Sequence, residues 1–499
     1  MTGPTRLGRS IRYHSPVVVR RLHPAGVLVG AAIIAYVLRF WSLTYDIHQG
    51  LGTSSYDYGL YDQGIWLVSR FREPFITLMG RNLFGDHTSF IVIFLVPFYW
   101  IAPGALTLLG SQSIIIAAGA VPIYGALKSR LGNWGAALLA VAYLVHPAVG
   151  WTNLENFHPD AALGFTIGLA LWGALDRRWR LYLVGVVLSL LVKEDVSLVI
   201  VPIGIWVAWR RDRRIGLATV VGSIIYMAIA MFGVMRLLIG VPTRNGWRIP
   251  FGGPWGVLST LVTSPGEVIS YLVSDGRPWY LFQMMVPVAF IFVRRPWVAM
   301  ASAVVLFTNI LSQFWYQYHI EYHYSLIAVP ALVIGAGYAI AQLSTTARRR
   351  IALGAVAVSA GIASVLWSPV PWGRRSVPHW SGDHPVAVAA REIVAEVPDG
   401  VAVSAHYAAT AHLAHRPEIY QFPNPFRIVL YGTDIADENG RVIERAERVE
   451  YLVLPIDRPI ELEVDFQEID AAFVKVSAND YWELWQRDRS IPLPPRGGE

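Results

Sequence analysis

The 499-residue chain is 54% hydrophobic and only 15% charged, whereas about 25% of the residues in a soluble globular chain are charged. It has no cysteine, which excludes disulfides, thiolate metal sites and cysteine nucleophiles. The net charge of +6 divides into a basic part and an acidic part. Residues 1–366 hold 28 Lys and Arg against 14 Asp and Glu, and residues 367–499 hold 13 against 21. Membrane topology accounts for the basic excess, so no nucleic-acid partner is expected.

The N-terminus is rich in arginine and is followed by an apolar run over residues 25–43. No small-residue cleavage site follows, and the run is longer than the apolar core of a secretory signal. This pattern predicts an uncleaved first membrane helix, with residues 1–23 in the cytoplasm.

Apolar runs of about 20 residues can cross a bilayer, and the sequence predicts about eleven such spans between residues 24 and 367. Three of them are short, and we expect those to be tilted, broken or partly interfacial. The predicted spans are 24–43, 105–127, 133–148, 161–175, 180–193, 196–209, 215–239, 279–293, 297–313, 325–343 and 351–367.

Positive charges orient these spans, because cytoplasmic loops of membrane proteins are enriched in Lys and Arg. With the N-terminus inside, the inner segments hold 19 basic residues and only two acids, Asp176 and Asp212. The outer segments hold the other 12 acids of the membrane part. We therefore predict a multi-pass protein of a bacterial plasma membrane, with a long first outer loop at 44–106 and an extracytoplasmic C-terminal domain.

The first outer loop carries two acids in the sequence SSYDYGLYDQGIW. Ser54 or Ser55 followed by Asp57 predicts a helix start, and residues 60–68 predict an amphipathic helix lying on the bilayer. Asp57 and Asp62 are five positions apart, so on one helix they would point about 140° apart. Asp57 is either an N-cap or a carboxylate that faces a membrane-surface cavity as a general base or metal ligand.

Four further polar clusters fall in predicted outer segments. Each has a structural alternative, such as a helix cap or an interfacial aromatic belt, beside the interpretation as a substrate pocket. We assign no metal ligand, since the histidines do not form an HExxH motif. The residues that we expect to contact substrate are Asp86, His87, His158, Asp160, Lys193, Glu194, Asp195, Arg244, Arg248, His319, Glu321 and His323.

Two of these clusters have a specific geometric expectation. Glu155 lies beside His158 and Asp160 in the sequence ENFHPD, which makes a polar cluster plausible there. His319 and His323 would share a face if their segment were helical. No P-loop, dinucleotide-binding glycine pattern or serine nucleophile elbow is found in the chain.

The motifs YDYGLYDQGIW, NLFGDH, NFHPD, VKED and EYHYS occur in this order. In combination they resemble an uncharacterised family of bacterial membrane proteins, a domain of unknown function, over residues 56–486. That family is similar to the GT-C superfamily of membrane glycosyltransferases. The resemblance implies transfer of a sugar from a polyprenyl-phosphate donor to a glycan or glycolipid acceptor of the cell envelope.

By the same resemblance Asp57 matches the catalytic acid, with Asp62 as its rival. GT-C enzymes commonly show paired acids at this point, whereas Tyr58 follows Asp57 here. Lys193, Arg244 and Arg248 are expected to hold the phosphate. A divalent metal such as Mg²⁺ or Mn²⁺ is compatible with this chemistry and not required by it. The alternatives are a transporter or flippase of a lipid-linked glycan and a non-catalytic scaffold.

The acidic part predicts a small α/β domain over residues 368–490. Residues 385–397 indicate a helix, residues 401–405 and 451–456 indicate strands, and Asn479-Asp480 indicates the turn of a hairpin. The remaining residues, 491–499, are rich in Pro and Gly and are expected to be disordered.

Overall fold

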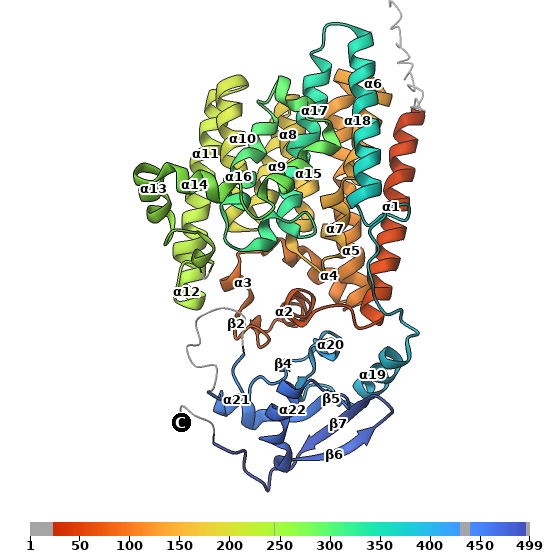
Figure 1. The fold of residues 1–499 in the computed structure, drawn as a ribbon, viewed down its shortest axis with the longest axis vertical. Coiled ribbons are helices and arrows are strands. Elements are labelled where there is room, and N and C mark those ends of the chain that lie inside the picture. The colour runs from red at the N-terminus through yellow and green to blue at the C-terminus, as the bar shows by residue number, and fades with distance from the viewer. Residues whose placement is uncertain (1–22, 244, 430–439, 496–499) are drawn as a thin grey trace, which may run out of the picture.

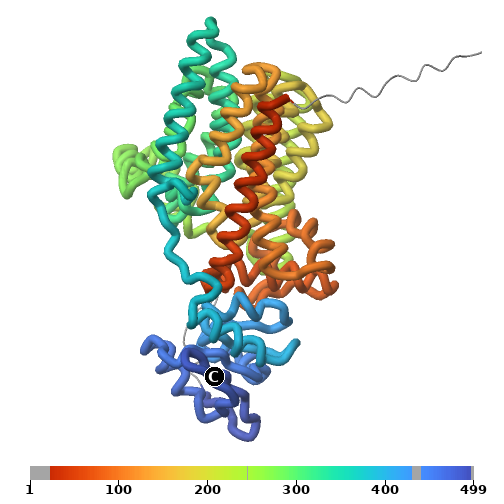
Figure 2. The backbone as a smooth tube through the Cα atoms, turned by 90° about the vertical axis from the view of Figure 1, so that its right-hand side faces the viewer, coloured from red at the N-terminus to blue at the C-terminus, as the bar shows by residue number. Residues whose placement is uncertain are grey.

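A computed structural model describes residues 23–243, 245–429 and 440–495. A large helical part leads into a smaller domain built on a sheet, as Figure 1 shows. The mainly helical fold with a C-terminal α/β domain is confirmed. Figures 1 and 2 both place the small domain at one end of the helical part, where α1 and α18 end. The expected cytoplasmic segment 1–23 falls almost wholly outside the described residues.

Long apolar helices form the body of the large part. Their interiors are rich in Leu, Val, Ile, Ala and Gly, and three of them begin at side-chain caps, His23, Asp212 and Thr345. These helices are α1 (Pro24–Gln49), α5 (Ala105–Ala118), α6 (Ala120–Leu144), α8 (Leu163–Leu175), α9 (Trp179–Leu190), α10 (Ser197–Arg210), α11 (Arg213–Ala228), α17 (Val329–Ala341) and α18 (Thr346–Trp367).

The stretch from α5 to α6 is a hairpin rather than one long helix. Residues 27 positions apart in a straight helix would be separated by about 40 Å. The Tyr143 hydroxyl nevertheless donates a hydrogen bond to the carbonyl of Ile116 at 2.9 Å. The chain reverses at Gly132, whose φ of 73° is readily adopted only by glycine. The separate spans predicted at 105–127 and 133–148 correspond to the two arms.

Helices α10 and α11 form a second hairpin with closely approaching backbones. A Cβ added to Gly216 would lie 2.1 Å from the amide nitrogen of Ala208. Small residues at such contacts allow membrane helices to pack without a hydrophobic driving force. Any side chain at Gly216 would therefore push the two helices apart.

The number of membrane crossings stays a prediction. Within the described residues, five helices are long and apolar enough to cross a membrane by length and composition. The predicted spans at 279–293 and 297–313 are broken into short pieces. These pieces are α15 (Arg277–Met285), η7 (Val286–Val288), η8 (Ile291–Arg294), η9 (Ala299–Ser302) and α16 (Ala303–Leu311).

Shorter elements connect the long helices, most of them near the small domain. The first group follows α1 and is η1 (Ser55–Gly59), α2 (Leu60–Ser69), β1 (Phe75–Ile76), β2 (Arg81–Asn82), α3 (Leu83–Asp86), η2 (Phe90–Leu95) and α4 (Val96–Tyr99). The others are α7 (Pro147–Leu154), η3 (Pro159–Ala162), η4 (Glu194–Val196), η5 (Ile229–Met235), α12 (Arg236–Ile239), η6 (Gly246–Arg248), α13 (Pro254–Thr263), α14 (Pro265–Leu272), η10 (Trp315–Tyr318) and η11 (His323–Ala328).

Helix α2 confirms the helix expected in the first loop but not its place on a bilayer surface. Most of its side chains are buried, because it lies between the helical part and the small domain (Figure 1). The Gln63 amide donates hydrogen bonds to Thr77 at 3.0 Å and to the carbonyl of Arg416 at 3.2 Å. Whether α2 lies on the bilayer stays a prediction. The bond to Arg416 shows that a residue about 350 positions away covers its polar face, which a window of sequence cannot reveal.

The small domain is a five-stranded mixed sheet with strand order β4-β3-β5-β7-β6. Strand β3 pairs in parallel with β4 and β5, and β7 pairs antiparallel with β5 and β6. Its elements are α19 (Pro385–Ala395), β3 (Ala402–Ala405), α20 (Tyr407–Thr410), η12 (Ala411–Leu413), β4 (Ile419–Gln421), α21 (Ile443–Arg448), β5 (Val449–Pro455), α22 (Ile460–Gln467), η13 (Asp470–Ala472), β6 (Phe473–Ala478) and β7 (Trp482–Arg487). Leu493, in the tail expected to be disordered, is buried in this domain, and residues 496–499 lie outside the described residues.

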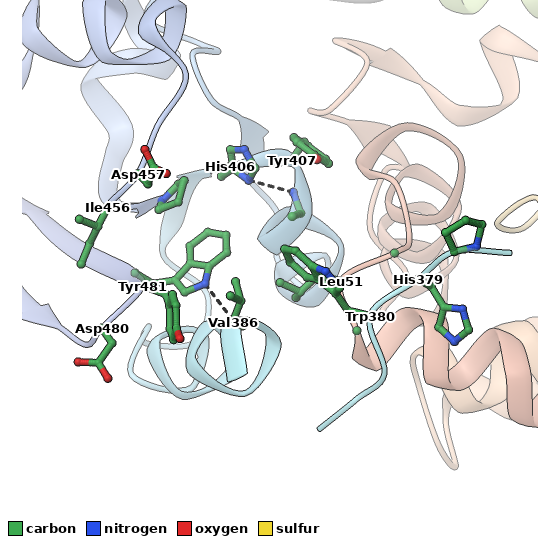
Figure 3. Close-up of a pocket in the computed structure, with 16 residues that line it drawn as sticks. Leu51, His379, Trp380, Val386, His406, Tyr407, Ile456, Asp457, Asp480 and Tyr481 are labelled. Carbon is green, nitrogen blue, oxygen red and sulfur yellow. Dashed lines mark hydrogen bonds between the residues drawn. The ribbon is translucent and has the colours of Figure 1, made fainter. Parts of the chain in front are cut away.

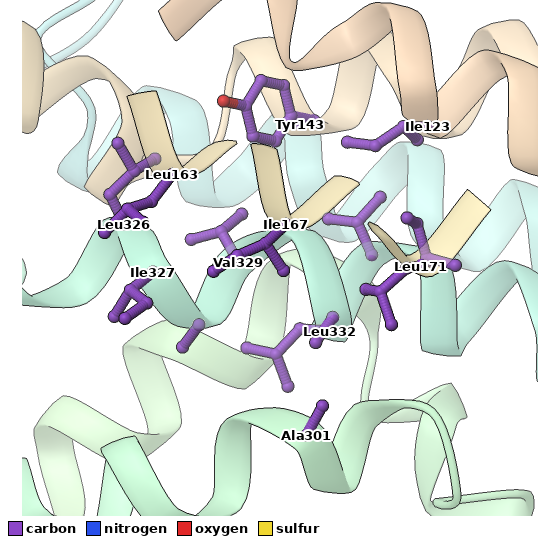
Figure 4. Close-up of a cluster of buried hydrophobic side chains, with 14 of the residues drawn as sticks. Ile123, Tyr143, Leu163, Ile167, Leu171, Ala301, Leu326, Ile327, Val329 and Leu332 are labelled. Atoms are coloured by element: carbon purple, nitrogen blue, oxygen red, sulfur yellow. The ribbon is translucent and has the colours of Figure 1, made fainter. Parts of the chain in front are cut away.

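Apolar clusters stabilise the helical part and its junction with the small domain. Figure 4 shows the largest, in which Ile167 and Leu171 of α8 face Val329 and Leu332 of α17. A second cluster joins the first loop to the small domain and includes the fully buried Ile65 and Ile76. Burying a side chain of this size contributes about 1.5–3 kcal/mol. This cluster makes the small domain a fixed wall beside α2.

Candidate functional site

A polar cavity of about 380 Å³ lies where the first loop meets the segments that follow α7, α9 and α16. Its charged lining includes Asp57, Asp160, Lys193 and Arg248. Residues from five separate stretches of the chain converge there, and several of them were expected to contact substrate. The convergence that the topology predicted is therefore present at this cavity.

Asp57 enters the cavity from η1, a single π-helical turn. Such turns are rare and frequently occur at functional sites. Ser54 is the N-cap, since its hydroxyl accepts a hydrogen bond from the Asp57 amide at 3.1 Å. The interpretation of Asp57 as an N-cap is therefore wrong. Burial raises the pKa of Asp57 to about 6, and its carboxylate accepts no hydrogen bond from the residues that the structure describes.

Asp62 points away from the cavity and is bound on every side. Its carboxylate accepts hydrogen bonds from the hydroxyls of Tyr99 at 2.7 Å and Tyr58 at 3.2 Å. His415 of the small domain donates a third from Nε2 at 3.0 Å. Burial lowers the pKa of His415, but Asp62 outweighs it and the net pKa is raised. The two acids considered together in the sequence thus lie in different environments.

Two cations flank Tyr324 in the cavity wall. Lys193 is buried, with its Nζ 3.3 Å from Asp160 and 5.8 Å from the centre of the Tyr324 ring. Arg248 donates a hydrogen bond to the Tyr324 hydroxyl at 3.3 Å and lies 4.4 Å over the ring of Phe314. The whole lining holds four carboxylates and three Lys or Arg side chains, and Lys193 and Arg248 are the cations of this wall that could bind an anion. Arg244 lies outside the described residues.

The residues of the VKED turn, 192–195, lie in different surroundings: Lys193 lines the cavity, whereas Glu194 is buried in the protein. Glu194 accepts hydrogen bonds from His87 at 2.8 Å and from the Thr88 amide at 3.1 Å. Burial alone would raise the pKa of Glu194, but His87 lowers it to about 2. Glu194 therefore anchors the loop at His87 and does not line the cavity, and Asp195 lies on an exposed edge.

Asp86 and His87 both line the cavity. Asp86 forms an ion pair of 3.0 Å with Arg81 of β2. Helix α3 ends at Asp86, and the following helical segment is preceded by Ser89, so Asp86 does not cap it. Arg81 was not among the expected residues, because nothing in the local sequence marks an arginine in a two-residue strand as part of a site.

Glu155, His158 and His323 form a compact group in the cavity wall. Their ligand atoms lie within 4.8 Å of one another. The rings of His158 and His323 stack with centroids 3.7 Å apart. Glu155 was expected in a polar cluster with His158 and Asp160 but was not counted among the residues that contact substrate, although its spacing from His158, Glu-x-x-His, was a further signal.

His319 and Glu321 do not line the cavity. The condition under which His319 and His323 would share a face is not met, because their segment is not one helix. It consists of two short 3-10 helices, η10 and η11, joined by a turn in which the Tyr322 amide donates to the His319 carbonyl. His319 is exposed and packs edge-on against Trp315 at 5.0 Å. Only His323 reaches the cavity.

An apolar groove of about 640 Å³ adjoins the polar cavity. It runs between η2 and α4 on one side and α5 and α8 on the other, and Phe94, Phe98, Ile114 and Phe165 line it. His158 lines both the groove and the polar cavity. A molecule with an apolar chain and a charged head could occupy the two spaces together.

A third and larger cavity, of about 870 Å³, lies between the end of α1 and the small domain. Figure 3 shows its wall, where Tyr407 and Tyr481 lie with His406 and the carboxylates of Asp457 and Asp480. Burial lowers the pKa of His406 to about 4. No Lys or Arg among the described residues lines it, so it lacks the cations that the polar cavity offers to an anion.

Solved structures of two membrane proteins resemble this fold. ArnT of Cupriavidus metallidurans, bound to undecaprenyl phosphate, matches with a TM-score of 0.54 and 13% identity, over 92% of this chain and 98% of that one. Its apo form matches with a TM-score of 0.53 and 15% identity, over 93% and 99%. The oligosaccharyltransferase of Archaeoglobus fulgidus, in a complex with zinc and sulfate, gives 0.47 and 14%, over 93% and 74%.

The likeness to ArnT agrees with the GT-C resemblance found in the sequence. At such low identity the likeness shows the fold alone. No curated protein matches the chain significantly. A family model described as a predicted membrane protein (DUF2079) matches residues 47–460, and the chain belongs to this family.

Proposed function

We propose that the protein is a membrane glycosyltransferase that moves a sugar from a polyprenyl-phosphate carrier to a cell-envelope acceptor. The observation that carries this proposal is the apolar groove that meets the charged cavity at His158. A prenyl chain fits the groove by its chemistry, and a phosphate fits beside Lys193 and Arg248. ArnT, which shares the fold, is bound to undecaprenyl phosphate in its crystal structure.

In the proposed reaction the acceptor hydroxyl attacks the anomeric carbon of the donor sugar. The bond between this carbon and the phosphate oxygen breaks, and both electrons leave with the phosphate, which stays on the lipid. Asp57 takes the proton of the hydroxyl, a role that suits a carboxyl with a pKa near the working pH. Lys193 and Arg248 stabilise the growing charge on the phosphate.

We also propose that the cavity opens on the extracytoplasmic side of the plasma membrane. The basic turns lie together at the far end of the helical part: Arg130 pairs with Asp176 at 2.8 Å, and His23 packs against Trp134 at 6.1 Å. Cytoplasmic loops carry such charges. The chain has no cysteine, so single cysteines can report the side. Ala471→Cys should react with a membrane-impermeant maleimide in intact cells, and Ala347→Cys only after permeabilisation.

The activity test uses the purified chain in proteoliposomes with a panel of polyprenyl-phosphate-linked sugars and envelope extract. Sugar transfer by the wild type, lost in Asp57→Asn and retained in Asp62→Asn, supports the proposal. Mass spectrometry of envelope glycans in a deletion strain identifies the acceptor. Movement of the lipid-linked sugar across the bilayer without any product would overturn the proposal in favour of a flippase.

A further inference from the structure

We propose that Glu155, His158 and His323 together bind one divalent metal ion of the zinc type in the wall of the polar cavity. The His323 Nδ1 lies 3.1 Å from one Glu155 carboxylate oxygen, and the His158 Nε2 lies 3.8 Å from the other. Ligand atoms around a tetrahedral zinc ion are separated by about 3.3–3.6 Å, since each bond is about 2.0–2.2 Å long. The three side chains are thus already at coordinating distance.

Rigid elements hold the three residues in place. Glu155 is the first residue after α7, His158 directly precedes η3, and His323 begins η11. The His158 amide donates a hydrogen bond to Gln112 of α5 at 2.9 Å. Ligands fixed by surrounding secondary structure give a site that does not need to assemble from a flexible loop.

A buried ring nitrogen supports the site independently. His158 is only 6% exposed, and its Nε2 has no hydrogen-bond partner in the part of the chain that the structure describes. A buried polar atom without a partner costs about 1–3 kcal/mol. A metal bound at this nitrogen would remove that cost, since it accepts the lone pair that no donor reaches.

The ligand types select the ion. Two imidazole nitrogens and one carboxylate suit Zn²⁺ and its first-row neighbours, whereas Mg²⁺ and Ca²⁺ take oxygen ligands. Three protein ligands leave a fourth position, which is the pattern of zinc sites that bind a further molecule. Because all three residues line the cavity, that position would be open to a phosphate or hydroxyl oxygen. Metal binding does not depend on the proposed transfer reaction.

Metal binding can be measured on the full chain in detergent with neither donor nor acceptor present. After treatment with a chelator, the protein is titrated with Zn²⁺ by calorimetry, and bound metal is counted by mass spectrometry after desalting. We expect one zinc ion per chain and no comparable binding of Mg²⁺. Cobalt substitution should give the visible spectrum of a tetrahedral nitrogen and oxygen site, with no thiolate band because the chain has no cysteine.

Matched variants separate this site from other histidines. His158→Ala and His323→Ala should each lower zinc affinity by more than about tenfold, because even outer-shell changes cost 10–100-fold. Glu155→Gln tests the same site with almost no change in shape. His319→Ala removes an exposed histidine outside the group and should bind zinc as the wild type does.

Less than about a tenth of an equivalent of zinc on monodisperse wild-type protein would overturn the site. So would unchanged affinity in a His158→Ala/His323→Ala double variant that stays monodisperse. Failure of sugar transfer in a chain that binds zinc stoichiometrically would count against the proposed function alone. Transfer by a chain that binds no zinc would count against the metal site alone.

Discussion

Asp57 and Asp62 are only about one and a half helical turns apart, yet they lie in two different regions of the molecule, the polar cavity and the junction with the small domain. Asp62 accepts three hydrogen bonds at the junction with the small domain, whereas Asp57 faces a cavity with no donor from the described residues. Burial raises the pKa of Asp57 to about 6. Buried polar groups that serve stability are bonded, while groups that serve chemistry are left available with shifted pKa values. The contrast separates an acid held by hydrogen bonds from the acid that we propose to be reactive.

The largest expected effect is the loss of transfer in Asp57→Asn. Removing a general base typically lowers the rate by about 10²–10⁴-fold, and the side chain keeps its size, so expression should be unchanged. The measurement is the turnover of a lipid-linked sugar in proteoliposomes. Asp62→Asn is the matched control, with turnover near that of the wild type. Equal losses of turnover in the two variants would show that Asp57 and Asp62 do not have different roles.

Arg248→Ala should have the next largest effect. It should weaken substrate binding in the polar cavity and leave the junction with the small domain unchanged. A hydrogen bond to a charged group contributes about 1.5–3 kcal/mol, which corresponds to roughly 10–100-fold weaker binding of a polyprenyl phosphate. Competition with a labelled donor measures this affinity. Lys128→Ala, an exposed charge at the far end of the helical part, is the control. Unchanged affinity in Arg248→Ala would show that the phosphate binds elsewhere in the protein.

Asp62→Asn should instead weaken the junction between the helical part and the small domain. It should lower the stability of the protein rather than the rate of transfer. An amide keeps one accepting oxygen, which can still serve Tyr99 and His415, but it brings an NH₂ group against the Tyr58 hydroxyl. Losing such a bond costs about 1–3 kcal/mol. Limited proteolysis between α18 and α19 reports release of the small domain, and denaturant unfolding gives the free energy. Proteolysis as slow as in the wild type would show that the apolar cluster around Ile65 alone holds the junction.

The local sequence identified both acids as candidates but did not show which of them faces the cavity. A helix start at Ser54 or Ser55 and different directions for the two acids follow from periodicity. The meeting of Asp160 and Lys193 follows from their place on the same predicted side of the membrane. The choice between the acids does not, because His415, the partner of Asp62, lies 353 positions further on.

The absence of long-range contacts from the local sequence also explains the other differences between the predictions and the structure. The covering of α2 depends on the small domain, and the failure at His319 depends on a break between 3-10 turns that periodicity cannot detect. The hairpin at Gly132 was predictable, since a glycine separates two apolar runs. Contacts between distant segments thus determine which of the predicted polar residues meet.

The smallest expected effect is a pH-dependent change in the stability of the folded protein, caused by Asp57. Between about pH 4 and 6 the folded Asp57 holds a proton that the unfolded chain has released, because its pKa rises from 3.8 to about 6 on folding. The wild type therefore loses stability as the pH rises through this window and recovers none of it above pH 6. Asp57→Asn has no such proton and should exceed the wild type by about 1–3 kcal/mol at pH 8, with little difference at pH 4. Free energies of unfolding at the two pH values measure this. An Asp57→Asn variant less stable than the wild type at pH 8 would mean that the folded protein stabilises this carboxylate, which would contradict its raised pKa.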